Sequence, residues 1–164
     1  MDYLIDNVIE KDLKHILDLN QKLLPAVSNL NFKDLITLKK RSSYFKVLRI
    51  KKIIKGFLIA LPPNTSYESI NYIWFNERFK SFIYVDRICI DLDMQKKGYG
   101  YLFYKDLLKF FFIDFKRITC EVNIIPKNLD SEIFHKRFGF KEIGRQLTDN
   151  GEKLVSLKEC IIKK

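Results

Sequence analysis

Four stretches of the chain are predicted to be helices, and in the first and third of them apolar residues recur every three or four positions, a spacing typical of helices with one buried face. The third stretch is the most regular, because leucines and aromatic residues follow each other along one face. The fourth begins at a cap, either Asn128 or Asp130, and stops at Gly139. The four predicted helices cover residues 10–29, 31–41, 98–115 and 128–138.

Shorter apolar runs, some of them alternating with polar residues, are typical of strands. The clearest is "SFIYVDRICIDL", residues 81–92, while "YFKVLRI" and "IIKGFLIAL" are joined by two lysines as a hairpin. Residues 62–79 combine prolines and polar residues with several aromatics, so we expect a long loop there, of the kind that often serves function. The predicted strands cover residues 2–9, 44–50, 53–61, 81–92, 117–125, 140–145 and 153–161.

The elements follow each other in the order β-α-α-β-β-β-α-β-α-β-β. The strand–helix–strand unit of residues 81–124 predicts a parallel pair with a right-handed crossover, and the hairpins add antiparallel strands. The chain has 164 residues and neither an internal repeat nor a linker, so we expect a single domain, residues 1–164. The predicted fold class is α/β, with one mixed, mostly antiparallel sheet of about seven strands and about four helices.

The charge of the chain points to an anionic partner. Lys and Arg number 30 against 20 Asp and Glu, which gives a formal net charge of +10. A basic surface suits nucleic acid, an acidic membrane face or a phosphorylated cofactor. The lysines are spread along the chain, however, so solvation explains them equally well. No nucleic-acid-binding motif occurs, and nucleic acid therefore ranks last among the partners that we expect.

Cysteines, histidines and hydropathy bear on location and on metal binding. The chain has 3 cysteines and no Cys-x-x-Cys pair, which favours a reducing, cytoplasmic setting. Its start lacks a signal-peptide pattern, and no stretch is apolar for long enough to cross a bilayer. The two histidines, His15 and His135, lie far apart in the sequence. We therefore expect neither a membrane partner nor a metal site.

The stretch "DLDMQKKGYGYLF", residues 91–103, joins the clearest strand to the most regular helix. The first turn of a helix has unpaired backbone N–H groups and the positive end of the helix dipole. Glycines at this place let a phosphate approach the backbone, and Lys96 and Lys97 add positive charge. A P-loop needs Lys-Ser or Lys-Thr after its last glycine, and a dinucleotide loop needs a third glycine where Phe103 stands. The stretch therefore predicts a phosphate cradle of another kind.

Two motifs resemble signatures of the GNAT superfamily of acetyl-CoA-dependent N-acetyltransferases. Residues 95–100, "QKKGYG", resemble its Gln/Arg-x-x-Gly-x-Gly/Ala pyrophosphate loop, and residues 128–140, "NLDSEIFHKRFGF", resemble its second signature. The order of elements matches over nearly the whole chain. The segments "YVDRICI", "CEVN" and "FHKRFGF" look like a poorly characterised subgroup of predicted acetyltransferases. The resemblance implies a single-domain acyl-CoA N-acyltransferase fold and transfer of an acetyl group from acetyl-CoA to an amine.

The resemblance also implies which residues bind acetyl-CoA. In such enzymes the pyrophosphate lies on the backbone of the glycine loop, and the pantetheine arm pairs with the fourth strand, where a backbone N–H stabilises the oxyanion. Asn128 would contact the pantetheine arm but also fits a helix cap, and Lys96 and Lys97 also fit simple solvation. The implied cofactor-binding residues are Ile88, Cys89, Ile90, Gln95, Lys96, Lys97, Gly98, Tyr99, Gly100, Asn128 and Ser131.

Acetyl transfer needs a base for the attacking amine, and an acid can assist the leaving thiolate. The superfamily often uses a tyrosine as the acid, and the resemblance places His135 there, either as an acid or base or as a residue of the helix surface. Ser131, one helical turn earlier, could orient the ring. Glu121 and Asp86 are the candidates for the base, because each lies inside a predicted central strand, where acids are unusual. Of the two, we favour Glu121. Asp86 alternatively pairs with a basic residue of a neighbouring strand, and Arg87 points to the opposite face.

The acceptor side is predicted from aromatic residues and one arginine. Tyr72, Trp74 and Phe75 would border a partly apolar acceptor or, alternatively, pack the loop onto the sheet. Arg87 is a candidate ligand for an acidic substrate. We expect an amine of a small molecule or an amino-acid-like acceptor; a non-catalytic CoA-binding module and, less favoured, a peptide N-acetyltransferase are the alternatives. The acyl chain and the oligomeric state are left open, a homodimer included.

Overall fold

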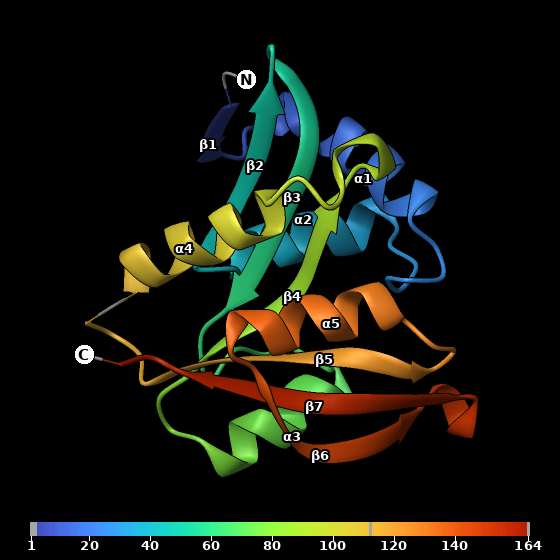
Figure 1. Cartoon of the computed structure of the whole chain (residues 1–164), viewed down its shortest axis with the longest axis vertical. Helices are drawn as coiled ribbons and strands as arrows, with labels where there is room; N and C mark the ends of the chain where they lie inside the picture. Colours follow the sequence, from blue (N-terminus) through green and yellow to red (C-terminus); the bar gives the residue numbers. More distant parts are fainter. Residues whose placement is uncertain (1–2, 112, 164) are drawn as a thin grey trace. The chain divides into compact units, whose positions relative to one another are not determined.

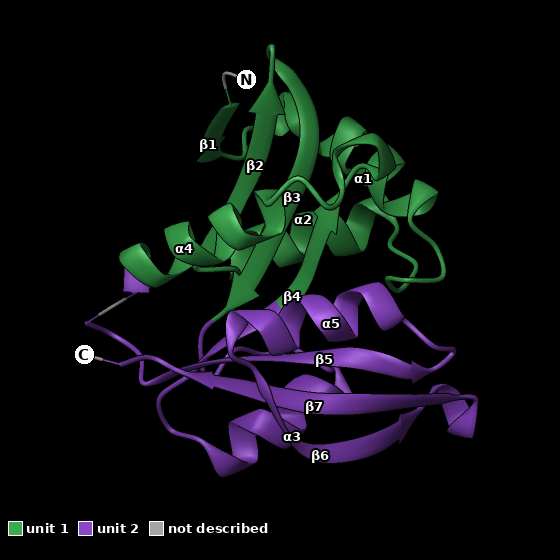
Figure 2. Cartoon of the chain, in the orientation of Figure 1, with its two compact units in different colours: residues 1–61, 86–110 green, residues 62–85, 111–164 purple. Residues whose placement is uncertain are grey.

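The computed structural model describes residues 3–111 and 113–163. Its strands form a seven-stranded mixed sheet in the order β1-β2-β3-β4-β5-β7-β6, with five α-helices (Figure 1). The predicted fold class is therefore confirmed. The chain divides into two compact units, which we call unit 1 (residues 1–61 and 86–110) and unit 2 (residues 62–85 and 111–164) (Figure 2). The single domain expected over residues 1–164 stays a prediction.

Unit 1 holds the glycine loop and the strands that lead to it. β4 enters it from unit 2 after Val85, and short 3₁₀ turns precede α1 and α4. Its elements are β1 (Tyr3–Asn7), α1 (Leu13–Lys22), α2 (Phe32–Arg41), β2 (Tyr44–Ile50), β3 (Ile53–Leu61), the second part of β4 (Ile83–Ile90) and all but the last residue of α4 (Tyr99–Phe111).

Helices cover both faces of the sheet in unit 1. α1 and α2 lie on one face of β3, and α4 lies on the other (Figure 1). α4 is tied to β2 through Asp106, which accepts hydrogen bonds from the Tyr44 hydroxyl at 2.7 Å and the Lys46 ammonium at 2.6 Å. Gly56 lets β3 approach β4 closely, because a Cβ there would lie 2.8 Å from the Cys89 carbonyl oxygen. The start of α4 and the end of β4 are thereby held on a packed scaffold.

Unit 2 is also built of a sheet between two helices. β5 is its central strand: it runs parallel to the start of β4, with Tyr84 opposite Thr119, and antiparallel to β7, with Glu121 opposite Leu157. α5 lies on one face and α3 on the other (Figure 1). Its further elements are α3 (Ile70–Arg78), β5 (Arg117–Ile125), α5 (Leu129–Phe138), β6 (Lys141–Thr148) and β7 (Lys153–Ile161).

The loop predicted over residues 62–79 was wrong in its second half, which forms α3. Ser69 caps this helix, since its hydroxyl accepts the N–H of Tyr72. Apolar periodicity does not mark the helix, because one apolar residue, Ile73, is exposed while Phe75, two positions on, is fully buried. The aromatic residues expected on a loop therefore lie on a helix.

The other predicted helices are confirmed with shorter ends. The helix expected over residues 10–29 ends at Lys22, before Pro25, which disfavours helical backbone in the residue that precedes it. The helix expected over residues 98–115 spans Tyr99–Phe111, and Phe112 lies outside the described residues. Of the two caps considered for α5, Asn128 is the one present, and Gly139 ends the helix with a φ of +113°.

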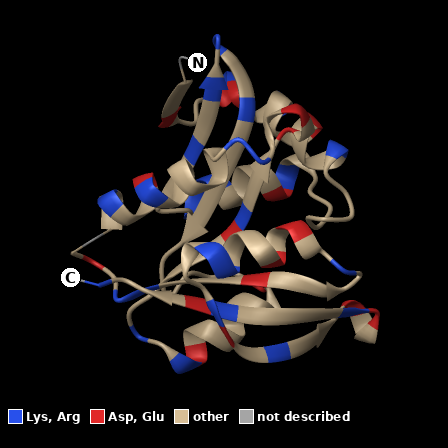
Figure 3. Ribbon diagram, in the orientation of Figure 1, with Lys and Arg blue, Asp and Glu red and all other residues tan. Residues whose placement is uncertain are grey.

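Charged side chains of both signs are scattered over all elements rather than gathered on one (Figure 3). Within residues 3–111 and 113–163, no group of three His, Cys, Asp or Glu residues could hold a metal ion. In the same part of the chain, no helix has the length and hydropathy needed to span a membrane.

Candidate functional site

The glycine loop of unit 1 runs from the 3₁₀ turn Leu92–Met94 to the start of α4. Gln95 anchors it, because its side-chain amide donates to the Ile90 carbonyl at 3.0 Å. Lys96 and Gly98 follow with φ values of +60° and +86°. This left-handed backbone is costly for most residues but open to glycine. The loop therefore turns sharply between β4 and α4, and its shape depends on Gly98.

The first turn of α4 presents backbone donors to this loop. The N–H of Leu102 donates to the Gly98 carbonyl at 3.1 Å, so helical bonding begins only there, and the N–H groups of residues 99–101 cannot reach a carbonyl of the helix. A Cβ built on Gly98 would meet no atom within 4 Å. Open space beside helix-start donors, with the positive end of the helix dipole, suits an anion. The residues present therefore fit the pyrophosphate of coenzyme A.

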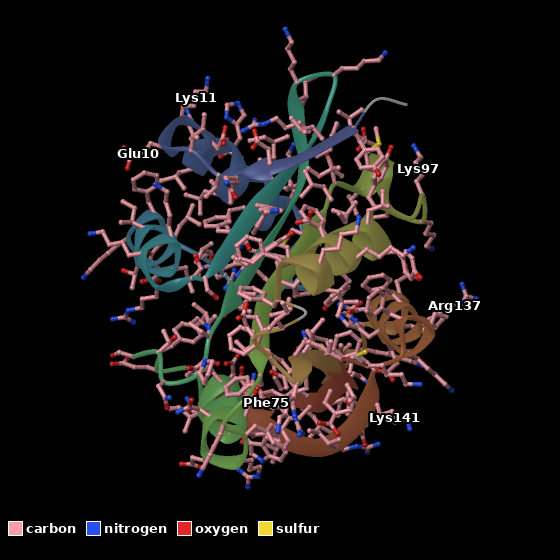
Figure 4. All side chains as sticks on the ribbon, turned by 90° about the vertical axis from the view of Figure 1, so that its left-hand side faces the viewer. Glu10, Lys11, Phe75, Lys97, Arg137 and Lys141 are labelled. Atoms are coloured by element: carbon pink, nitrogen blue, oxygen red, sulfur yellow. The ribbon has the colours of Figure 1, made fainter. Side chains whose placement is uncertain are left out.

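Charges around the loop are arranged so that its acids are neutralised. Lys55 binds Asp91 at 2.9 Å and Asp93 at 2.8 Å. These hydrogen bonds, that to Asp93 first, raise the pKa of Lys55, and the Lys55 ammonium lowers the pKa of Asp93. Lys97 projects from the loop (Figure 4), where its ammonium donates to the Asp93 carbonyl at 2.7 Å, and Lys96 is exposed. Lys55 thus pairs with the two acids that flank the 3₁₀ turn before the loop.

The strand before the loop has a buried thiol between two half-buried isoleucines. Cys89 is 1% exposed, and Ile88 and Ile90 are intermediate. Burial raises the pKa of the Cys89 thiol to about 12, so the side chain stays protonated and cannot serve as a nucleophile near neutrality. The pairing expected between the backbone of Ile88–Ile90 and a pantetheine arm stays a prediction.

The expectation that Arg87 would not pair with Asp86 was wrong. The guanidinium Nε donates to the Asp86 carboxylate at 2.7 Å, and both side chains are about 5% exposed or less. Neighbouring side chains of a strand start on opposite faces, but the long arginine chain bends back to its neighbour. Arg87 also donates to the side-chain oxygen of Asn20 at 2.8 Å and to the hydroxyl of Ser28 at 3.3 Å. The Arg87 guanidinium is thus engaged by the protein itself.

Glu121 of unit 2 has a partner that the sequence did not indicate. The Tyr84 hydroxyl donates to the Glu121 carboxylate at 2.8 Å. Tyr84 is 0% exposed, and its ring packs edge-on against Tyr72 at 5.4 Å between centroids. Glu121 itself is half-buried. A buried phenol therefore fixes the direction of a carboxylate that is itself only partly buried.

His135 is buried under α5 rather than lying on the helix surface. The ring is 3% exposed and packs against Phe140 at 5.1 Å between centroids. Its Nδ1 lies 2.8 Å from the Ser131 carbonyl, which can only accept, so this nitrogen carries a proton. The Ser131 hydroxyl lies 3.2 Å from the same nitrogen. Burial lowers the pKa of His135 to about 4, so the ring is uncharged at a pH near 7.

This depressed pKa predicts a pH-dependent stability. An unfolded histidine binds its proton near pH 6.5 and the folded one only near 4, so the free energy of unfolding falls as pH drops through this window. The loss is on the order of 1 kcal/mol per pH unit. Urea unfolding at about pH 7 and about pH 5 measures it. The substitution His135→Asn should flatten this dependence, whereas His15→Asn, at an exposed position, should leave it unchanged; equal slopes in all three proteins would contradict the assignment.

The aromatic residues of α3 divide into buried and accessible ones. Tyr72 is 1% exposed, with its hydroxyl donating to the Pro62 carbonyl at 2.7 Å, and Phe75 is 0% exposed. Trp74 is half-buried and covers Gly144 so closely that a Cβ there would lie 2.9 Å from its ring. The Arg78 guanidinium lies 4.0 Å from the centroid of the Trp74 ring, so Trp74 is the least buried of the three but is packed by protein side chains as well.

The structure groups the predicted site residues by unit. Unit 1 holds the residues from Asp86 to Gly100, and unit 2 holds Glu121, Asn128, Ser131, His135 and the aromatics of α3. The sequence did not indicate that Tyr84 contacts Glu121 or that Asn20 and Ser28 contact Arg87. A tyrosine inside an apolar strand is read as core, and Asn20 and Ser28 lie far from Arg87 in the sequence, so only the tertiary contacts reveal them.

Comparison with solved structures finds the same fold over essentially the whole chain. An acetyltransferase of the GNAT family from Streptococcus pneumoniae is 16% identical, with a TM-score of 0.72 and coverage of 99% of this chain and 100% of that one. Arabidopsis thaliana Naa50, in complex with the bisubstrate analogue CoA-Ac-MVNAL, is 17% identical, with a TM-score of 0.75 and coverage of 98% and 99%. A spermidine N-acetyltransferase chimera of SpeG from Vibrio cholerae and hSSAT is 19% identical, with a TM-score of 0.71 and coverage of 98% and 96%. No family model and no curated protein matches the chain.

Proposed function

From the premise that this chain has the GNAT acetyltransferase fold, we propose that it is an N-acetyltransferase that moves an acetyl group from acetyl-CoA to an amine. The observation that carries the proposal is the glycine loop, where Gly98 leaves open space beside the donors of the first turn of α4. The acceptor is an amine of a small molecule or an amino-acid-like compound. The subgroup resemblance stays a prediction.

The donor is bound by residues of unit 1. The N–H groups from Gln95 to Gly100 receive the pyrophosphate, and Lys96 and Lys97 neutralise its charge. The backbone of Ile88–Ile90 pairs with the pantetheine arm, and an N–H there stabilises the negative charge that develops on the thioester oxygen. Asn128, in unit 2, has a capping role, in which it accepts the Ser131 N–H at 3.2 Å. Its contact with a pantetheine arm stays a prediction.

The base that we propose is Glu121. When the amine nitrogen attacks the thioester carbon, a C–N bond forms, the C–S bond breaks and the ammonium proton passes to the Glu121 carboxylate, directly or through water. Tyr84 keeps that carboxylate in one orientation through its 2.8 Å hydrogen bond. Asp86 is the poorer base, because its carboxylate is buried against Arg87.

His135 is the residue that the resemblance places where an acid would protonate the leaving thiolate. The ring of His135 is uncharged at a pH near 7, because burial lowers its pKa to about 4. Its single N–H proton is on Nδ1 and is donated to the Ser131 carbonyl. Thiolates are stable enough to leave unprotonated. The neutral His135 also favours the second candidate function, a module that binds CoA without turnover.

Two measurements test the proposal. Millimolar acetyl-CoA should raise the melting temperature, since a ligand at about 100 times its dissociation constant adds about 2.7 kcal/mol to stability. Thiol release should then appear with at least one amine of a panel that includes free amino acids, glycinamide, spermidine and the peptide Met-Val-Asn-Ala-Leu. Absence of any shift would contradict acetyl-CoA binding, and a shift without thiol release from any amine would favour the binding module.

A further inference from the structure

The turn that joins β2 to β3 consists of two lysines, Lys51 and Lys52, between the paired residues Ile50 and Ile53. Both lysines have left-handed backbone, with φ values of +49° and +68°. A two-residue hairpin turn of this kind favours asparagine and glycine, because left-handed backbone strains most residues that have a Cβ. Turn formation alone therefore does not explain why lysine stands at both positions.

The two lysines of the turn carry charges that no acid of the described protein neutralises. Both side chains are exposed, and within residues 3–111 and 113–163 neither ammonium group has a hydrogen bond or an ion pair. Two acids that follow β4, Asp91 and Asp93, are instead paired with Lys55 of β3 at 2.9 Å and 2.8 Å. The turn, which forms one end of unit 1 (Figure 1), therefore presents two positive charges to its surroundings.

Exposed apolar side chains accompany these charges. Ile53, the residue after the turn, is 61% exposed, and Tyr3 of β1, whose partner in β2 directly precedes the turn, is 48% exposed. Leu92 is 66% exposed and lies near the same end of β3, because the N–H of the preceding residue, Asp91, donates to the Lys55 carbonyl at 2.9 Å. Transfer of such side chains into an apolar phase is favourable in proportion to the area covered.

We propose that this end of unit 1, made of Tyr3, residues 51–53 and Leu92 and called the hairpin tip, docks on an anionic lipid surface. Lysines are attracted to anionic headgroups, while exposed apolar side chains enter the boundary between headgroups and acyl chains. Nucleic acid would also attract the lysines, but single strands are bound by aromatic stacking, which Ile53 and Leu92 cannot supply. The docking is peripheral and reversible, because the tip offers only a turn and a few side chains.

This docking surface is independent of the proposed acetyl transfer, because none of its residues is assigned to acetyl-CoA or to the acceptor. It revises the expectation of no membrane partner, which rested on the lack of an apolar stretch able to cross a bilayer. Docking at a lipid surface needs no such stretch. It is therefore consistent with the finding that no helix of the described residues could span a membrane.

Sedimentation with vesicles tests the proposal, with phosphatidylcholine alone and with phosphatidylcholine that contains about one third phosphatidylglycerol. The whole chain should bind only the anionic vesicles, and its binding should weaken as salt rises. The double substitution Lys51→Asn with Lys52→Gly should weaken this binding about 30-fold. It should also raise the melting temperature by about 2–5 °C, because it relieves the strained turn, so the lost binding would not come from misfolding.

Ile53→Ser separates the apolar contribution from the charge. It keeps both lysines, and it should weaken binding to the anionic vesicles about tenfold while leaving any binding of a short single-stranded RNA unchanged. The matched control is Lys22→Gln with Lys33→Gln, which removes two exposed lysine charges from α1 and α2. This control should change vesicle binding by less than about threefold, because the charges lie outside the docking surface.

Three results would overturn the proposal. The first is no sedimentation with anionic vesicles, and the second is an equal loss of binding in the tip and control double variants. The third is binding of the RNA instead of the vesicles, lost in Lys51→Asn with Lys52→Gly, which would assign the tip to nucleic acid. The acetyl-CoA thermal shift should be the same in all of these variants, so the proposed function and this inference fail separately.

Discussion

Replacing Gly98 by glutamate is expected to abolish the rise in melting temperature that millimolar acetyl-CoA gives the wild-type chain. The new side chain would enter the open space beside the loop and place a carboxylate where we propose that the pyrophosphate binds. The backbone φ of +86° at position 98 would also strain any residue with a Cβ, by about 1–2 kcal/mol. Charge repulsion and the displaced backbone donors act in the same direction. Differential scanning fluorimetry with and without acetyl-CoA measures the loss.

A control variant separates the effect of backbone strain on the melting temperature from the loss of the acetyl-CoA shift. Gly151→Glu provides this control, because Gly151 has a φ of +92°, and a Cβ there also meets no atom within 4 Å. It introduces the same charge and a similar backbone strain at a position outside the glycine loop that has no assigned role. We expect Gly151→Glu to melt earlier than the wild type and to keep the full acetyl-CoA shift. An undiminished shift in Gly98→Glu would remove the glycine loop from the proposed site.

Glu121→Gln is expected to lower kcat by a factor of about 100 to 10,000, the range over which a positioned acid or base contributes. The amide keeps the shape of the side chain but cannot take up the proton of the attacking amine. Tyr84→Phe should cost less, since it leaves the carboxylate present and removes only the 2.8 Å hydrogen bond that orients it. Steady-state thiol release with an accepted amine measures both effects.

The two effects should not add. If Tyr84 acts through Glu121, then Tyr84→Phe in the Glu121→Gln background changes kcat little further. Glu159→Gln is the control for loss of a carboxylate in the same sheet, because Glu159 pairs with Arg117 at 2.6 Å and has no assigned role. A full residual kcat in Glu121→Gln would shift the base to another group, and independent losses in the double variant would give Tyr84 a separate role.

The sequence by itself determined all elements of the fold except α3, and it also located the glycine loop. Apolar periodicity, Gly139 and the strand alternation located the sheet and four of its helices, because these signals are local and each residue reports its own burial. The glycine loop was readable for the same reason: its chemistry depends on consecutive residues, Gln95 to Gly100, at one strand–helix junction. The sequence did not predict α3, because apolar residues of this helix lie on both its exposed and its buried face, as Ile73 and Phe75 show.

Only the tertiary structure decided which partners the polar residues have. Glu121 was singled out as an acid in a strand, but the Tyr84 hydroxyl that directs it comes from another strand, 37 positions earlier. Arg87 was expected to face a substrate, yet Asn20 and Ser28, 67 and 59 positions away, engage its guanidinium. Hydrogen bonds between distant segments leave no periodic trace in a sequence, because each partner alone fits a loop, a helix or a strand. Local patterns therefore identified the glycine loop, while the groups that orient the Glu121 carboxylate and engage the Arg87 guanidinium emerged only from the folded chain.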